Sequence, residues 1–142
     1  MKHKTTLIVR GGGDLASGVI HRLYKCGYQV LVLECAKPSA IRRRVSFGEA
    51  VYDGTSRVEG VTGRLIKDIS ECRKVWDEKE IPILVDENAD AVSKLKPDAL
   101  IDAILAKKNL GTTRMMAPLT IGLGPGFTAR VDVDYVVETQ RG

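Results

Sequence analysis

The hydrophobic pattern begins with a β-α-β unit. Residues 5–10 form a short β-branched and apolar run that stops at three glycines, as a buried strand entering a tight turn does. Apolar residues then recur at helical spacing between Leu15 and Leu23, and Gly27 follows as a C-terminal stop. Residues 29–34 are a continuous apolar run closed by an acid, which is typical of a parallel strand buried on both faces.

The rest of the chain alternates between helical and strand patterns. An amphipathic helix is predicted from Pro38 to about Ala50, although Gly48 in its interior costs roughly 1 kcal/mol. Strands are predicted over residues 58–66, 81–85, 99–105, 117–123 and 131–138, and helices over 69–79 and 90–95. This alternation predicts an α/β, Rossmann-like fold, with a mostly parallel sheet and helices on both faces. The 142 residues have the size of a single domain.

Composition narrows the classes of function. Twenty-two Lys and Arg against eighteen Asp and Glu give a net charge of +4, spread along the chain, which suits a phosphorylated ligand. A nucleic-acid partner is not expected, because aromatic residues make up only 5% and no dense basic stripe is present. No run approaches a signal peptide or a membrane span, so we expect a cytoplasmic protein without a membrane partner. Three cysteines without metal-ligand spacing predict reduced thiols rather than disulfides or zinc.

The glycine-rich turn is the main candidate site. Gly11, Gly13 and Ala16 fit the pattern G-x-G-x-x-G/A between a strand and a helix. The first glycine permits a tight turn, the second lets the backbone approach a pyrophosphate, and the alanine allows close helix packing. The N–H groups and the macrodipole at the helix start favour an anion. We therefore expect a phosphate contact from Gly11, Gly12, Gly13, Asp14 and Leu15. Glu34, at the end of the next strand, is the candidate acceptor for a ribose diol.

Further candidate contacts follow other predicted elements. Arg42 belongs to a run of three arginines after the second strand and is a candidate for binding a phosphate. Asp102 and Lys108 belong to a strand end and the loop after it, and Gly124 lies in a second glycine cluster. The carboxyl edge of an open α/β sheet is where ligands bind, so these loops are expected to outline a cleft.

Other interpretations of these residues stay open. The glycines also suit a sharp turn without a ligand, with Asp14 capping the helix and Glu34 solvated at a strand end. No Ser-His-Asp or Cys-His constellation can be argued from His3 and His21. We therefore assign no catalytic residue and no metal ligand, and leave open whether the chain is an enzyme.

Four segments carry a resemblance to a known family. They are VRGGGDLA at 9–16, AIRRRVSF at 40–47, DAILAKKN at 102–109 and IGLGPGF at 121–127. Together they resemble the selenium-dependent molybdenum hydroxylase accessory protein family almost from end to end. That family is similar in outline to the xanthine dehydrogenase accessory factors. Its members are usually longer, so the resemblance implies that this chain corresponds to an amino-terminal part.

The resemblance implies a maturation protein rather than a metabolic enzyme. Such a protein would bind molybdopterin or its dinucleotide and help to insert it into the apo-enzyme of a molybdenum hydroxylase. The glycine turn and Glu34 by themselves equally suit an NAD(P)-dependent oxidoreductase or another nucleotide-binding domain. An interaction module with an empty turn is a third interpretation, and homo-oligomer formation stays open.

Overall fold

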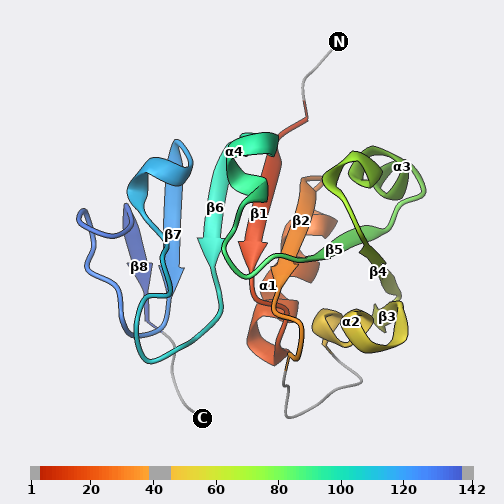
Figure 1. Ribbon diagram of the computed structural model, residues 1–142, viewed down its shortest axis with the longest axis horizontal. Coiled ribbons are helices and arrows are strands. Elements are labelled where there is room, and N and C mark those ends of the chain that lie inside the picture. The colour runs from red at the N-terminus through yellow and green to blue at the C-terminus, as the bar shows by residue number, and fades with distance from the viewer. Residues whose placement is uncertain (1–3, 39–45, 139–142) are drawn as a thin grey trace.

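The protein is built around one eight-stranded sheet. The computed structural model describes residues 4–38 and 46–138, with strand order β3-β4-β5-β2-β1-β6-β7-β8 (Figure 1). Within these residues β3 and β4 pair antiparallel, and the other neighbouring strands pair in parallel. The predicted α/β fold with a mostly parallel sheet is confirmed.

The first β-α-β unit matches its prediction closely. It consists of β1 (Thr6–Arg10), α1 (Asp14–Lys25) and β2 (Gln29–Glu34). The two strands are parallel, with Thr6 opposite Gln29, and all of β1 is buried. Helix α1 ends where Gly27 takes a φ of +97° and donates its N–H to the Tyr24 carbonyl at 3.0 Å.

The middle of the chain differs from its prediction in two places. Of the helix expected from Pro38 to about Ala50, residues 39–45 lie outside the described part; Ser46 is extended, and the chain then forms η2 (Phe47–Glu49) and α2 (Ala50–Asp53). The strand expected over 58–66 is a hairpin of β3 (Thr55–Val58) and β4 (Val61–Ile66). Glu59 and Gly60 make its turn, with φ of 45° and 85°. Two positive φ values suit a tight hairpin turn, and the Glu-Gly pair is the signal that the prediction missed.

The remaining elements follow the predicted order. They are η3 (Ile69–Glu71), α3 (Cys72–Asp77), β5 (Ile81–Val85), α4 (Ala91–Leu95), β6 (Ala99–Asp102), η4 (Arg114–Met116), β7 (Leu119–Leu123) and β8 (Tyr135–Val137). Strand β6 ends three residues before its predicted limit, because the Asp102 carboxylate accepts the N–H of Ile104 at 3.1 Å and the chain turns there. Strand β8 is shorter than predicted, since residues 128–134 form turns and bridges before it.

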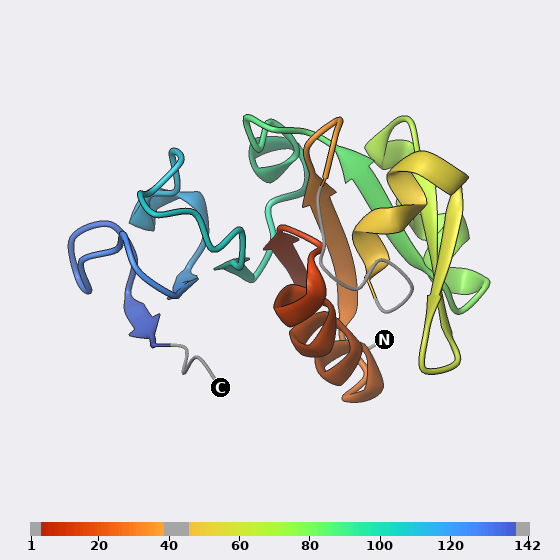
Figure 2. The ribbon, with the colours of Figure 1, turned by 90° about the horizontal axis from the view of Figure 1, so that it is seen from below.

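Helices cover both faces of one part of the sheet. On one face, α1, η2 and α2 pack Ile20 and Phe47 against Val9. On the other, α3 and α4 pack Val75 and Val92 into a second apolar cluster. In the described part of the chain no α-helix covers β7 or β8, which lie apart at one side (Figure 2).

The strand order reverses at β1. From β1 the chain first builds β2 and its neighbours on one side, and later returns to add β6, β7 and β8 on the other. Connections that leave neighbouring strands in opposite directions open a crevice beyond the carboxyl ends of those strands. We call this side of the sheet the carboxyl edge, and the side where the parallel strands begin the amino edge.

Candidate functional site: the glycine turn at the carboxyl edge

A pocket of about 440 Å³ opens at the carboxyl edge, where β1 and β6 separate. Its walls are the glycine turn with the first turn of α1, the end of β2, and the segment after β6. Of the predicted contacts, Gly11, Gly12, Gly13, Asp14, Leu15 and Glu34 all line it. The structure therefore brings together, at the strand-order reversal, the residues of the fingerprint and the acid that follows it.

Gly11 gives the turn its shape. Its φ is +101°, a conformation that L side chains rarely adopt, and its N–H donates to the Leu33 carbonyl at 2.7 Å. A Cβ at this position would lie 2.7 Å from the Ala103 carbonyl oxygen. A side chain is thus excluded both by backbone conformation and by the close approach of the segment after β6.

The start of α1 presents main-chain N–H groups to the pocket. Gly13 is the N-cap, with φ −73° and ψ −168°, and the first helical hydrogen bond runs from the Ser17 N–H to the Gly13 carbonyl at 2.8 Å. The N–H groups of Leu15 and Ala16 come before any intrahelical acceptor. Asp14 is the first helical residue, placed in the first turn of α1.

Glu34 ties the glycine turn to the end of β2. Its Oε2 accepts the N–H of Gly12 at 2.7 Å, and its Oε1 accepts the N–H of Cys35 at 2.8 Å. Each carboxylate oxygen has two lone pairs, so each keeps acceptor capacity for a ligand hydroxyl. The residue expected to bind a ribose thus also holds the turn in place.

The Gly12 carbonyl is held by three hydrogen bonds, here called the clamp, that the sequence did not predict. This oxygen accepts the Gly48 N–H at 2.8 Å, the Ser17 hydroxyl at 3.1 Å and the hydroxyl of Ser46. A Cβ at Gly48 would lie 2.9 Å from the Gly12 oxygen and 3.0 Å from Oε2 of Glu34. Gly48 was interpreted as a weak point in a helix; its role is close backbone packing. A glycine inside an apolar pattern was the available signal.

Asp102 supports the wall of the pocket that the segment after β6 forms. It is 1% exposed, and its Oδ2 accepts the Thr112 hydroxyl at 2.6 Å. The same hydroxyl accepts a hydrogen bond from Nη1 of Arg10 at 2.8 Å, and Nη2 of Arg10 donates to the carbonyls of Glu87 and Leu110. Asp102 does not line the 440 Å³ pocket. Its contacts hold the turn that places Ala103, Ile104 and Leu105 in the wall.

Among known proteins, the chain is similar to a bacterial protein. The chain is 51% identical over 136 residues to the uncharacterized protein YqeB of Escherichia coli (strain K12). The match covers 96% of this chain and 25% of the relative, so the chain spans about a quarter of that protein's length. No family model and no solved structure matches the chain.

Besides Asp102, three predicted contacts lie away from this pocket or outside the described residues. Arg42 falls in the segment 39–45, which the structure does not describe. Lys108 is exposed and does not line the pocket. Gly124 is buried, and its N–H donates to the Val137 carbonyl at 2.9 Å. The two loops that carry them pack on each other instead, since a Cβ at Gly126 would lie 2.9 Å from the Cα of Lys108.

The charges of the pocket are mixed. Among the described lining residues Asp14 and Glu34 are acids and Lys37 is the one base. Cys35 also lines the pocket, and burial together with the nearby Glu34 carboxylate raises the pKa of its thiol. Among the described residues, the groups that could bind a phosphate here are therefore main-chain N–H groups and Lys37.

Two further features of the described residues bear on the class of protein. They contain no group of three or more His, Cys, Asp or Glu side chains arranged to hold a metal ion, and all three cysteines are free thiols. No helix among them has the length and apolar character needed to cross a membrane.

Proposed function

We propose that this chain holds a phosphate-bearing cofactor, molybdopterin or its dinucleotide, as part of a maturation protein for a molybdenum hydroxylase. The cofactor class and the selenium-dependent hydroxylase partner come from the family resemblance of the four segments. The observation that carries the binding role is the pocket at the strand-order reversal, formed by the glycine turn and the start of α1.

The chemistry of the pocket supports a phosphoryl group. The N–H groups of Leu15 and Ala16 at the helix start would donate to its oxygens, assisted by the helix macrodipole. Lys37 lines the same pocket and supplies a positive charge. The volume of about 440 Å³ lies within the range of roughly 300–1,000 Å³ that small-molecule sites occupy. Leu15, Ile104 and Leu105 offer apolar surface to the organic part.

The protein's own residues would bind and orient the cofactor without reacting with it. Glu34 and the clamp on the Gly12 carbonyl fix the turn before any ligand arrives. A pre-organised turn loses little conformational entropy when a ligand binds, which favours affinity. A delivery protein must also release its cargo, and in this proposal the apo-hydroxylase receives it.

Equilibrium titration with molybdopterin dinucleotide tests the proposal. We expect saturable binding that Gly13→Val weakens by about tenfold or more, because its side chain would stand where the phosphoryl group approaches the helix start. The φ and ψ of Gly13 are open to any residue, so the variant should fold. Gly18→Ala is the matched control, since it lies on the same helix and its Cβ would meet nothing within 4 Å.

Two outcomes of this titration would contradict the proposal. No binding by the unaltered protein, or equal affinities for Gly13→Val and Gly18→Ala, would show that the glycine turn is not the cofactor site. Circular dichroism of both variants separates a lost contact from a lost fold.

The position of Glu34 favours a second candidate, an NAD(P)-dependent oxidoreductase. Its carboxylate stands at the end of β2 in the same pocket, where a Rossmann domain binds the adenosine ribose. Mixing the protein with NADH would then change the nicotinamide fluorescence. Glu34→Gln would weaken that response, because an amide offers one acceptor oxygen where the carboxylate has two. A flat fluorescence signal at high NADH concentration rules this candidate out.

A further inference from the structure

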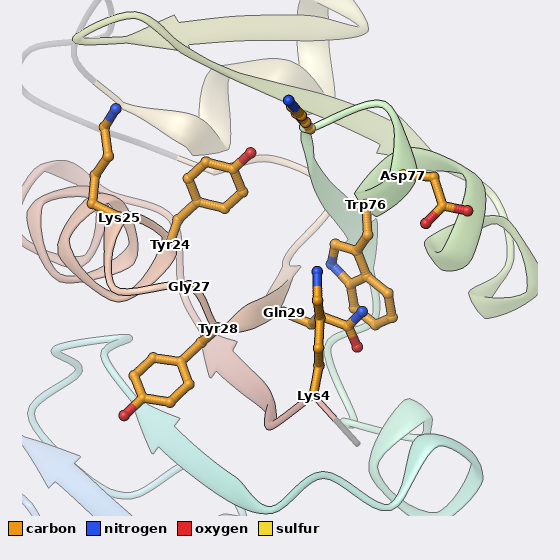
Figure 3. Close-up of a pocket in the computed structure, with 9 residues that line it drawn as sticks. Lys4, Tyr24, Lys25, Gly27, Tyr28, Gln29, Trp76 and Asp77 are labelled. Carbon is orange, nitrogen blue, oxygen red and sulfur yellow. The ribbon is translucent and has the colours of Figure 1, made fainter. Parts of the chain in front are cut away.

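A second pocket, of about 350 Å³, lies at the amino edge, at the opposite end of β1 from the glycine turn. It is formed where the last turns of α1 and α3 meet the starts of β1 and β2 (Figure 3). Its walls carry three lysines and three aromatic side chains: Lys4, Lys25, Lys79, Tyr24, Tyr28 and Trp76. The chain has seven aromatic residues in all, so nearly half of them gather here.

The charge of this amino-edge pocket is positive. Asp77 is the one acid among its lining residues, against three lysines. Figure 3 shows Asp77 turned away from the hollow, with Tyr24 and Trp76 on opposite sides of it. Ammonium groups attract an anion, and aromatic faces accept a flat ring.

The lysines could instead stabilise the C-termini of α1 and α3, since cations are favoured beside the partial negative charge there. Main-chain N–H groups, however, already donate hydrogen bonds to carbonyls at both C-termini. The Tyr24 carbonyl accepts the Gly27 N–H at 3.0 Å, and the Trp76 carbonyl accepts the Lys79 N–H at 2.9 Å. Within the described part of the chain, the side chains of Lys4, Lys25 and Lys79 form no hydrogen bond or ion pair. Their ammonium groups are therefore available to a ligand.

The aromatic wall is held in place before any ligand binds. The Trp76 indole N–H donates to the Val30 carbonyl at 2.9 Å, and the Arg73 guanidinium lies 5.5 Å from the centre of the Trp76 ring. Gln29, which also lines the pocket, is 7% exposed and is anchored by accepting the Thr6 hydroxyl. Fixed walls reduce the entropy lost on binding.

We propose that the amino-edge pocket binds a small aromatic anion, a planar ring that carries a phosphate or carboxylate group. Lys4 and Lys79 bind the anionic group, and the ring lies between Tyr24 and Trp76; Lys25 extends beyond Tyr24, away from Trp76. This site is separate from the glycine turn and does not depend on the function proposed for that turn.

Tryptophan fluorescence tests this site directly, because Trp76 is the only tryptophan in the chain. Adenosine monophosphate and benzoate are the aromatic-anion probes. Inorganic phosphate is an anion without a ring, and adenosine has an aromatic ring without a charge, so these two serve as control ligands. We expect saturable quenching by at least one aromatic anion, and a much weaker response to inorganic phosphate or adenosine. A flat response to both aromatic anions at millimolar concentration overturns the proposal.

Two lysine substitutions locate the anion. Lys4→Ala and Lys79→Gly should each raise the Kd for the quenching anion by roughly tenfold, the effect of one lost charge-assisted contact. Lys79 has a φ of +62°, which glycine adopts readily, so Lys79→Gly should keep the fold. Lys67→Ala and Lys94→Ala are matched controls that remove the same charge from exposed positions outside the pocket.

The controls also decide between the two edges of the sheet. Equal Kd values for the pocket variants and the control variants overturn the proposal. Gly13→Val, at the other edge, should leave the Trp76 response unchanged. If Gly13→Val abolishes the quenching, the anion binds at the glycine turn and the amino-edge site is wrong.

Discussion

The pockets at the two edges of the sheet are built from different parts of the polypeptide. At the carboxyl edge the walls are largely main chain, namely the glycine turn, the start of α1 and the segment after β6. At the amino edge they are long side chains from separate elements. A main-chain site depends on backbone conformation and close packing, so substitutions there change stability and binding together. A side-chain site can lose one residue and keep its fold.

Among substitutions that test this difference between the two pockets, we expect the largest loss of stability at Gly11. Gly11→Ala would force an L side chain into a φ of +101° and place its Cβ 2.7 Å from the Ala103 oxygen. We expect a loss of about 3 kcal/mol or more in the free energy of unfolding, measured by urea denaturation. Gly27→Ala, at the amino edge, is the control: its φ is +97°, but its Cβ would meet nothing within 4 Å.

The difference between these two variants isolates the clash from the backbone strain. Gly27→Ala should cost only about 1–2 kcal/mol, from conformation alone. Equal losses of stability for the two variants would mean that the close approach of Gly11 to the segment after β6 contributes nothing to stability. The interpretation of this edge as a tightly packed main-chain site would then be wrong.

The glycine turn was predictable because its requirements are local in the sequence. A strand, a fingerprint and a helix follow one another within residues 6–25, and the turn between them needs the φ of +101° that Gly11 adopts. The parallel sheet was predictable for a similar reason, since apolar runs alternate with helical periods. Glu34 was found because the fingerprint fixes its distance along the chain.

A smaller loss is expected from the buried network beneath the carboxyl edge. The Thr112 hydroxyl links Arg10 to Asp102, and all three residues are buried. Thr112→Val keeps the shape and leaves one donor and one acceptor without a partner. We expect a loss of about 2–3 kcal/mol in the free energy of unfolding. Thr113→Val is the exposed neighbouring control, and an equally small effect in both variants would contradict the structural role of the network.

Contacts between distant segments could not be predicted in this way. Gly48 packs on Gly12 from 36 positions away, and Trp76 and Lys4, 72 positions apart, line the same pocket. Nothing near Trp76 in the sequence indicates that Lys4 and Lys25, from distant segments, line the same pocket. Lys108 and Gly124 were predicted to contact a ligand because their loops follow strands of the sheet. These two loops pack on each other rather than around the pocket.

Glu34 offers a subtler way to separate folding from binding at the carboxyl edge. Glu34→Gln should cost about 1 kcal/mol, because an amide nitrogen cannot accept the N–H of Gly12 or Cys35. Hydrogen exchange at the Gly12 amide should become faster. Glu87→Gln is the control, since its carboxylate is exposed near the same edge. Unchanged exchange at Gly12 would show that the carboxylate does not hold the turn.

Alkylation of the three cysteines compares the two edges without any substitution, so the expected effects are the smallest. Cys26 is exposed at the end of α1, Cys35 lines the carboxyl-edge pocket, and Cys72 is 2% exposed, with burial raising its pKa to about 12. The thiolate is the reactive form, so a raised pKa slows alkylation. At neutral pH we expect Cys26 to react with iodoacetamide several-fold faster than Cys35, and Cys72 not to react in the folded protein.

The pH dependence and a ligand then distinguish the edges. Burial and Glu34 raise the pKa of Cys35, so its alkylation rate should keep rising with pH above the range in which a solvent-exposed thiol ordinarily ionises. A ligand in the carboxyl-edge pocket should slow Cys35 alone, because Cys26 lies outside that pocket. Mass spectrometry of the alkylated peptides measures each rate. Equal protection of both thiols would mean that the ligand stabilises the whole fold rather than covering one edge.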